Sequence, residues 1–305
     1  MPQDNRKNPF SLAPALTLVV LVLLFFGSRI YVSMPVVHYI CAGLLGFVAV
    51  MLPLLVYCRV CGGTFSSLFP LERPRPAARS LAFSALCVLI FMSALVKYGI
   101  FKADLPFSGV TLYGNALPYP ASFLQGLSAV LFLAVLPALA EELLLRGAVF
   151  YEYRPADSVG TVLLCALFSA FLGGTFGSFL PLFFSALIFS LVRYLTGNLR
   201  CVIAIHIGYR IWVLFFEKYF ALTALAEESH ALYRLLLMIV AGISVVSFFH
   251  FAEKTLQDRA DCGEKGPVFL PKRKRALAAF DRLTSPMLWI LALVFLVTAL
   301  IRLFV

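Results

Sequence analysis

Charged residues are scarce in this chain: Asp, Glu, Lys and Arg make up only 13% of its 305 residues, while 62% are hydrophobic. Together with a mean hydropathy of +0.95, this composition excludes an ordinary soluble domain and indicates a polytopic membrane protein. The seven cysteines are scattered, and four of them lie inside apolar runs, which excludes a disulfide framework. The chain also lacks a convincing internal repeat and a low-complexity tract.

The net charge of +10 does not indicate nucleic-acid binding. In a membrane protein, an excess of Lys and Arg mostly reflects cytoplasmic loops, so the expected surroundings are a lipid bilayer and no nucleic acid. We interpret the basic run Lys272–Arg275 as an ordinary cytosolic anchor, with binding of anionic lipid as the alternative. Cys58 and Cys61 form a single CxxC without a second pair, which is weak evidence for a metal site.

Nine apolar runs predict an all-α fold with about nine transmembrane helices. Their approximate bounds are 12–30, 36–57, 81–98, 123–150, 158–172, 180–195, a seventh that begins after residue 200, 232–252 and 286–305. We expect N-terminal transmembrane helices over 1–120, a functional core over 121–222, and C-terminal transmembrane helices with a cytosolic basic loop over 223–305. With the N-terminus in the cytosol, 17 Lys and Arg fall on the inner side and 6 on the outer side, which supports this orientation.

Two adjacent carboxylates, Glu141 and Glu142, lie deep in the apolar run 123–150 and are followed by Arg146. A charge at bilayer depth is costly, so it usually faces the protein interior and serves a function. Glu142 and Arg146 are i,i+4 neighbours and can pair, whereas Glu141 lies about 100° round the helix and is left free. The alternative is a structural ion pair beside a helix-end carboxylate.

An intramembrane histidine, His206, is predicted at a similar depth. The carboxylates lie roughly 13 Å and His206 roughly 9 Å from the cytosolic ends of their spans, at 1.5 Å per residue. We therefore expect Glu141, Glu142 and His206 to line one cavity that opens to the cytosol. A carboxylate and an imidazole in such a pocket can activate water, and the imidazole can bind a metal or donate to an oxyanion. A proton relay or a transport site is equally compatible with these residues, and His250 is a weaker candidate.

The pattern Glu141-Glu142-x-x-x-Arg146 resembles the EExxxR motif of the CPBP intramembrane proteases, which include type II CAAX prenyl proteases and bacterial Abi or bacteriocin-processing proteins. The turn Thr196-Gly197-Asn198 and the following His206 resemble the later block of that family, in which HxxxN follows a TG turn. The resemblance covers about 121–212 and implies an all-helical fold in a bacterial plasma membrane, with a site that faces the cytosol. It also implies cleavage of a prenylated or other membrane-associated peptide by glutamate-activated water, with a divalent metal such as zinc as a candidate cofactor.

Two positions depart from the family pattern. The FxxxH motif aligns with 168–172, which places Leu172 where the family has histidine, and an alternative alignment over 189–193 also lacks histidine. The final asparagine of the family falls on Arg210, one turn beyond His206 on the same helix face. Leucine cannot bind a metal or carry a proton. A permanent cation at Arg210 disfavours a nearby divalent metal, although it can pair with Glu141 or steady an oxyanion.

The sequence therefore predicts an intramembrane endopeptidase that acts on a peptide or membrane-protein substrate. Its expected site residues are Glu141, Glu142, Arg146, His206 and Arg210. By the resemblance, Glu141 is the general base, Glu142 is a polar ligand held by Arg146, and Glu141 and His206 are the candidate metal ligands. One alternative is a catalytically inactive relative that binds or escorts a membrane protein, which Leu172 and Arg210 favour. Another is a transporter or lipid-handling protein, but the outer halves of the spans contain few polar residues for a path.

Overall fold

The structure is a computed structural model that describes residues 12–30, 32–61, 69, 71–100, 110–153, 158–225, 230–263 and 284–304. Within these ranges the chain is almost entirely helical, which confirms the all-α prediction. The helices and the π-helical segments (η) are α1 (Leu12–Gly27), α2 (Pro35–Cys61), α4 (Pro76–Ala94), η1 (Leu95–Ile100), α5 (Phe123–Ala129), η2 (Val130–Val135), α6 (Leu136–Glu142), η3 (Leu143–Val149), α7 (Phe150–Tyr153), α8 (Ser158–Leu172), α9 (Phe176–Thr196), α10 (Leu199–Phe215), α11 (Glu217–Leu225), α12 (His230–Asp261) and α14 (Pro286–Phe304). The only strands in the described residues are β1 (Val110–Leu112) and β2 (Asn115–Leu117), which pair as an antiparallel hairpin.

Six helices in the described part of the chain are long and apolar enough to cross a membrane. They are Pro35–Val60, Pro76–Tyr98, Phe123–Tyr153, Phe176–Thr196, Ala231–Asp261 and Pro286–Phe304. Two further apolar helices, α1 and α8, are shorter, and α10 has only 17 residues. The membrane class is therefore confirmed, whereas the predicted count of nine spans is not.

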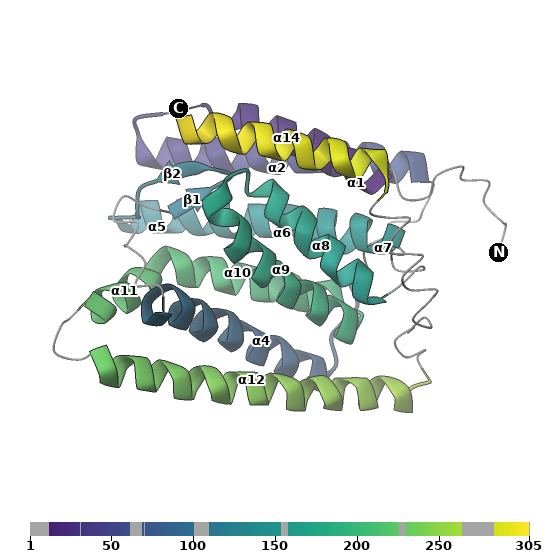
Figure 1. Ribbon diagram of the computed structural model, residues 1–305, viewed down its shortest axis with the longest axis vertical. Helices are drawn as coiled ribbons and strands as arrows, with labels where there is room; N and C mark the ends of the chain where they lie inside the picture. Colours follow the sequence, from purple (N-terminus) through teal and green to yellow (C-terminus); the bar gives the residue numbers. More distant parts are fainter. Residues whose placement is uncertain are drawn as a thin grey trace.

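The long helix Phe123–Tyr153, made of α5, η2, α6, η3 and α7, occupies the middle of the bundle (Figure 1). One side packs against α2, within an apolar core that also contains side chains of α1, α8 and α14. Its other side packs against α10, and a second core joins α10 to α4, α9 and α12. Because protein surrounds this helix on both sides, polar groups in its middle are shielded from lipid.

Two local expectations differ from the structure. The sequence predicts no element between the apolar runs 81–98 and 123–150, but the structure has the β1–β2 hairpin there, whose three-residue strands are too short to show a clear alternation. The eighth span was expected to end at 252, but α12 continues to Asp261, because the chain has no proline or glycine between residue 252 and Gly263. The run Lys272–Arg275 lies outside the described residues.

Candidate active site

The helix that carries the two carboxylates has π-helical turns on both sides of them, η2 before and η3 after. Pro137 contributes to this irregularity, because it has no N–H to offer to the carbonyl of Leu133 four residues earlier. That carbonyl accepts a hydrogen bond of 3.2 Å from Arg210 Nη1 on α10. Such π-turns are frequent at functional sites, and here the break in the helical ladder helps to hold a side chain from another helix.

The turn between α9 and α10 positions the histidine. Gly197 ends α9 with a φ of 66°, a left-handed conformation that favours glycine. Asn198 then caps α10, since its Oδ1 accepts a hydrogen bond of 2.8 Å from the Arg200 backbone N–H. This tight reversal lets α10 return beside α9 and places His206 two turns inside the bundle, next to the carboxylates.

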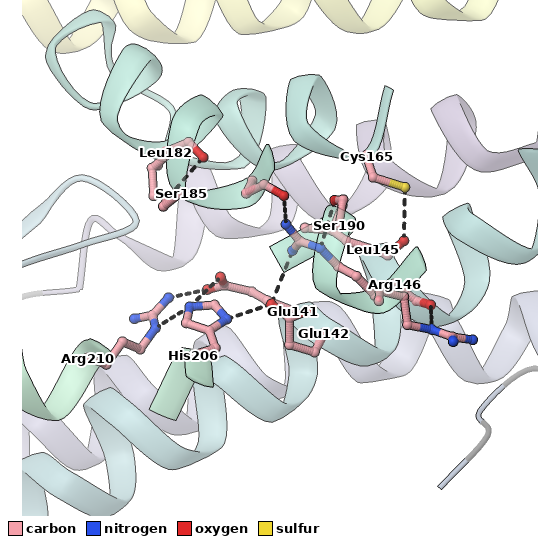
Figure 2. Close-up of polar contacts among 12 residues, drawn as sticks. Glu141, Glu142, Leu145, Arg146, Cys165, Leu182, Ser185, Ser190, His206 and Arg210 are labelled. Carbon is pink, nitrogen blue, oxygen red and sulfur yellow. Dashed lines mark hydrogen bonds and ion pairs between the residues drawn. The ribbon is translucent and has the colours of Figure 1, made fainter. Parts of the chain in front are cut away.

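Glu142 and Arg146 form the inner half of the site and are both 0% exposed. Arg146 Nη1 donates to Glu142 Oε1 at 3.1 Å, which is the i,i+4 pair predicted from the sequence (Figure 2). The remaining donors of the guanidinium turn to α9: Nε donates to Ser190 Oγ at 3.2 Å, and Nη2 donates to the Ala186 carbonyl at 2.9 Å. A buried ion pair needs these additional hydrogen bonds to compensate for the loss of hydration.

His206 connects the two halves of the site. Its Nδ1 lies 2.6 Å from Glu142 Oε1, and its Nε2 lies 2.9 Å from Arg210 Nε. Because a guanidinium can only donate, Nε2 must be the acceptor, so the proton of the neutral ring is on Nδ1 and is donated to Glu142. Phe189 stacks on the imidazole with 4.6 Å between the ring centroids. The imidazole is therefore fixed in one orientation and one tautomer.

Glu141 and Arg210 form the outer half of the site. Arg210 Nη2 donates to Glu141 Oε1 at 2.6 Å, and Glu141 Oε2 lies 3.7 Å from His206 Nε2 (Figure 2). The Arg210 side chain is 18% exposed, compared with 0% for that of Arg146. Two carboxylates and two guanidiniums thus balance each other around a neutral histidine, and the outer pair borders open space.

A cavity of about 500 Å³ adjoins this outer half, within the size range of small-ligand sites. Its lining includes Tyr113, Glu141, Leu172, Ser185, His206 and Arg210. Glu142 is absent from this lining, because it is fully buried on the far side of the imidazole. The expectation that both carboxylates line one cavity is therefore met by Glu141 and wrong for Glu142.

The cavity extends from the site toward the β1–β2 hairpin and the α8–α9 turn, where the exposed residues Thr111 and Gly177 contribute to its lining. In Figure 1 the hairpin lies at one end of the bundle, and the α9–α10 turn and the end of α12 lie at the other. The orientation derived from positive charges places this second end in the cytosol. With that orientation, the cavity approaches the carboxylates from the opposite side of the membrane, not from the cytosol.

All five expected site residues come together, but the weaker candidate His250 does not join them. His250 is exposed on α12, where its ring contacts Phe251. Arg193 is 4% exposed inside α9, and its Nε donates to the Arg146 carbonyl at 3.2 Å, so it also belongs to the buried polar network. Leu172, at the end of α8, does line the cavity, so the first alignment of the second motif fits the geometry better than the one that ends at Arg193.

The contribution of α9 was missed by sequence reasoning. Its residues Ala186, Phe189 and Ser190 hold Arg146 and His206, and the Arg146 guanidinium also lies 5.4 Å from the Phe189 ring centroid. The one available signal was the stretch 189–193, which had been considered only as a possible second motif. The sequence also gives no signal for Tyr113, because the strands of the hairpin that carries it have only three residues each.

The predicted metal ligands, Glu141 and His206, do not fit a metal ion in this arrangement. Arg210 donates to one oxygen of Glu141 and to Nε2 of His206, so a permanent cation occupies the position between them. In the described part of the chain, no group of three or more His, Cys, Asp or Glu residues is arranged to hold a metal. A metal ion held by Glu141 and His206 would therefore require Arg210 to be displaced.

Comparison with known families gives one match. Residues 123–212 match the model of the Rce1-like family, described as type II CAAX prenyl endopeptidase Rce1-like. This confirms the resemblance stated from the motifs, and the matched segment contains both carboxylates, Arg146, His206 and Arg210. No match to the chain was found among curated proteins or among solved structures. The chain is thus a membrane protein with a segment similar to the CAAX-type intramembrane proteases.

Proposed function

We propose that this protein is an intramembrane endopeptidase that cleaves prenylated or other membrane-associated peptides by glutamate-activated water. The observation that carries the proposal is the meeting of Glu141, His206 and Arg210 at one cavity, inside the segment that matches the protease family. We place the protein in a bacterial plasma membrane, as its resemblance to bacteriocin-processing proteins implies.

In this proposal, Glu141 is the general base. It borders the cavity, whereas Glu142 is fully buried and already bound to Arg146 and His206. The oxygen of water attacks the peptide carbonyl carbon while one water proton moves to Glu141. When the C–N bond breaks, this proton passes to the leaving amine. Glu142 acts indirectly, because it accepts the Nδ1–H of His206 and keeps the Nε2 lone pair directed toward the cavity side.

Arg210 takes the position at which the family has asparagine and contributes charge in place of a neutral amide. Its bond to Glu141 keeps that carboxylate ionised in a poorly hydrated site. The same cation stabilises negative charge that develops on the peptide carbonyl oxygen, since guanidinium donors in a water-poor pocket are effective partners for an oxyanion.

The Arg210–Glu141 pair also favours a second candidate function, that of a non-catalytic relative that binds or escorts a membrane protein. A carboxylate held at 2.6 Å by a guanidinium is ionised but less available to accept a proton from water. The leucine at position 172 removes the second histidine of the family motif from the same cavity.

The decisive experiment measures peptide hydrolysis by the purified protein in nanodiscs, with a panel of prenylated and unprenylated peptides and mass spectrometry of the products. We expect cleavage by the wild type and none by Glu141→Gln. A folded wild-type protein that binds these peptides but cleaves none of them would support the non-catalytic alternative. Product masses also identify which bond is cut.

A further inference from the structure

Tyr113 lies at the turn of the β1–β2 hairpin and lines the same cavity as Glu141, Leu172 and His206. The hairpin precedes the segment 123–212 that matches the protease family, so the family match assigns no role to this residue. Among the described residues, its hydroxyl is one of four groups with a buried polar atom that makes no hydrogen bond of good geometry, although the Glu141 carboxylate lies within hydrogen-bonding reach of it. Buried polar atoms are normally paired, so this one requires an explanation.

The backbone at Tyr113 is unusual. Its φ is 51°, and it is the only described residue other than glycine with a positive φ. Gly114 follows with a φ of 84°, so both central residues of the two-residue turn are left-handed, as a type I′ turn requires. Asn, Asp or Gly is usual at the first of these positions, and a tyrosine there is disfavoured. Such strain is most often retained where the side chain has a function.

The ring of Tyr113 is held firmly against α2. A Cβ atom added to Gly46 would lie 2.5 Å from the Tyr113 Cε2, so only glycine at that position leaves room for the ring. The hydroxyl lies near enough to Glu141 for that charge to act on it. Burial first, and then the charge of Glu141 and a hydrogen-bonding interaction with it, raise the pKa of Tyr113 well above its ordinary value, although Arg210 acts in the opposite direction. The hydroxyl therefore stays protonated and able to donate.

We propose that the Tyr113 hydroxyl is a catalytic hydrogen-bond donor that stabilises the oxyanion during peptide cleavage. This inference rests on the proposed peptidase function. When water attacks the carbonyl carbon, the C=O electrons move to oxygen and one water proton moves to Glu141. The Tyr113 O–H, which faces Glu141 before the reaction, then donates to that oxygen without giving up its proton. When the tetrahedral species collapses, the C=O bond re-forms, the C–N bond breaks, and the amine takes the proton held by Glu141.

The test is Tyr113→Phe, which keeps the ring against Gly46 and removes only the hydroxyl. The matched control is Tyr194→Phe, because the Tyr194 hydroxyl is also buried without a partner among the described residues but does not line the cavity. We expect kcat for a cleaved peptide to fall about 100-fold in Tyr113→Phe with KM unchanged, and the control to match the wild type. Binding of a peptide phosphonamidate, an analogue of the tetrahedral species, should weaken by the same factor, while binding of the product peptide should not change.

A kcat of Tyr113→Phe within about twofold of the wild type, in a protein whose activity is abolished by Glu141→Gln, would overturn this inference and leave the proposed function standing. An inert but folded wild type would overturn both. Equal losses in Tyr113→Phe and Tyr194→Phe would also overturn the inference, because a general effect of removing a buried hydroxyl would then explain the result. Thermal unfolding of each variant in the same nanodiscs checks that the fold is retained.

Discussion

The two neighbouring carboxylates of this site occupy different surroundings, although the sequence presents them as a pair. Glu142 is 0% exposed and is bound by Arg146 and His206, and α9 completes the hydrogen bonds of its arginine. Glu141 borders a cavity and is bound by Arg210, whose side chain is 18% exposed. The Glu142–Arg146 pair thus has the surroundings of a structural ion pair, whereas the Glu141–Arg210 pair has those of a reactive site. One residue along the helix, a rotation of about 100°, produces this difference.

The largest expected effect concerns the inner half of the site, the Glu142–Arg146 pair. Arg146→Met should leave the Glu142 charge buried without its cation and destabilise the protein by about 3–5 kcal/mol. The measurement is unfolding in mixed micelles, followed by near-UV circular dichroism. The double variant Arg146→Met with Glu142→Leu should recover part of this loss, because it removes both buried charges. A single variant as stable as the wild type would show that the inner pair is not structural.

The second prediction tests the outer half. Glu141→Gln should lower the rate of peptide hydrolysis by about 100-fold or more, because glutamine cannot accept a proton from water. Its effect on stability should be much smaller than that of Arg146→Met, since the remaining Arg210 borders the cavity and can be hydrated. Unfolding in the same micelles provides this comparison. A loss of stability equal to that of Arg146→Met would remove the distinction between the two halves.

The third prediction concerns the cation that borders the cavity. Replacing Arg210 by Asn and Leu172 by His should free Glu141 and His206 and add a second imidazole beside the same cavity. We expect this double variant to bind about one zinc ion per chain, the usual outcome for a site with carboxylate and imidazole ligands, and the wild type to bind much less. Metal content is measured by mass spectrometry after dialysis. Stoichiometric zinc in the wild type would mean that Arg210 moves aside when a metal binds.

The smallest expected effect is a difference in stability between alanine substitutions of two serines of α9, Ser190 and Ser185. Ser190→Ala removes the hydroxyl that accepts from Arg146 Nε and should cost about 1 kcal/mol of unfolding free energy. Ser185→Ala is the matched control, because Ser185 lines the cavity and its hydroxyl, among the described residues, donates only to the Leu182 carbonyl of its own helix. The control should change stability by a few tenths of a kcal/mol. Equal effects would indicate that Ser190 contributes little to the arginine network.

Much of the site could be predicted from the sequence, because several of its contacts are set by residues that lie close together in the chain. Glu142 and Arg146 are four residues apart on one helix, so their contact follows from helix geometry alone. The Thr196-Gly197-Asn198 turn also has a local cause, since glycine adopts the left-handed conformation and asparagine caps the next helix. His206 follows at a fixed distance from that turn, and this is why the motif pattern found it.

The contributions of α9 and the hairpin could not be predicted in this way. Ser190 reaches Arg146 across 44 residues of sequence, and no periodicity marks a serine that faces an arginine on another helix. The hairpin has strands of three residues, which are below the length at which alternation becomes visible. The direction of the cavity depends on which side chains leave space between α8, α10 and the hairpin, and side-chain packing is a property of the assembled bundle.

The sequence by itself determined that the chain is a helical membrane protein with two carboxylates, an arginine and a histidine deep in its apolar spans. Hydrophobic run length and the cost of buried charge are sufficient for that conclusion. Only the tertiary structure decided which carboxylate faces the cavity, that Arg210 lies between Glu141 and His206, and that Tyr113 reaches the same space. These features depend on contacts between segments that are distant in sequence. A buried charge in a low-dielectric interior needs a partner, and only the assembled fold decides which group lies close enough to pair with it.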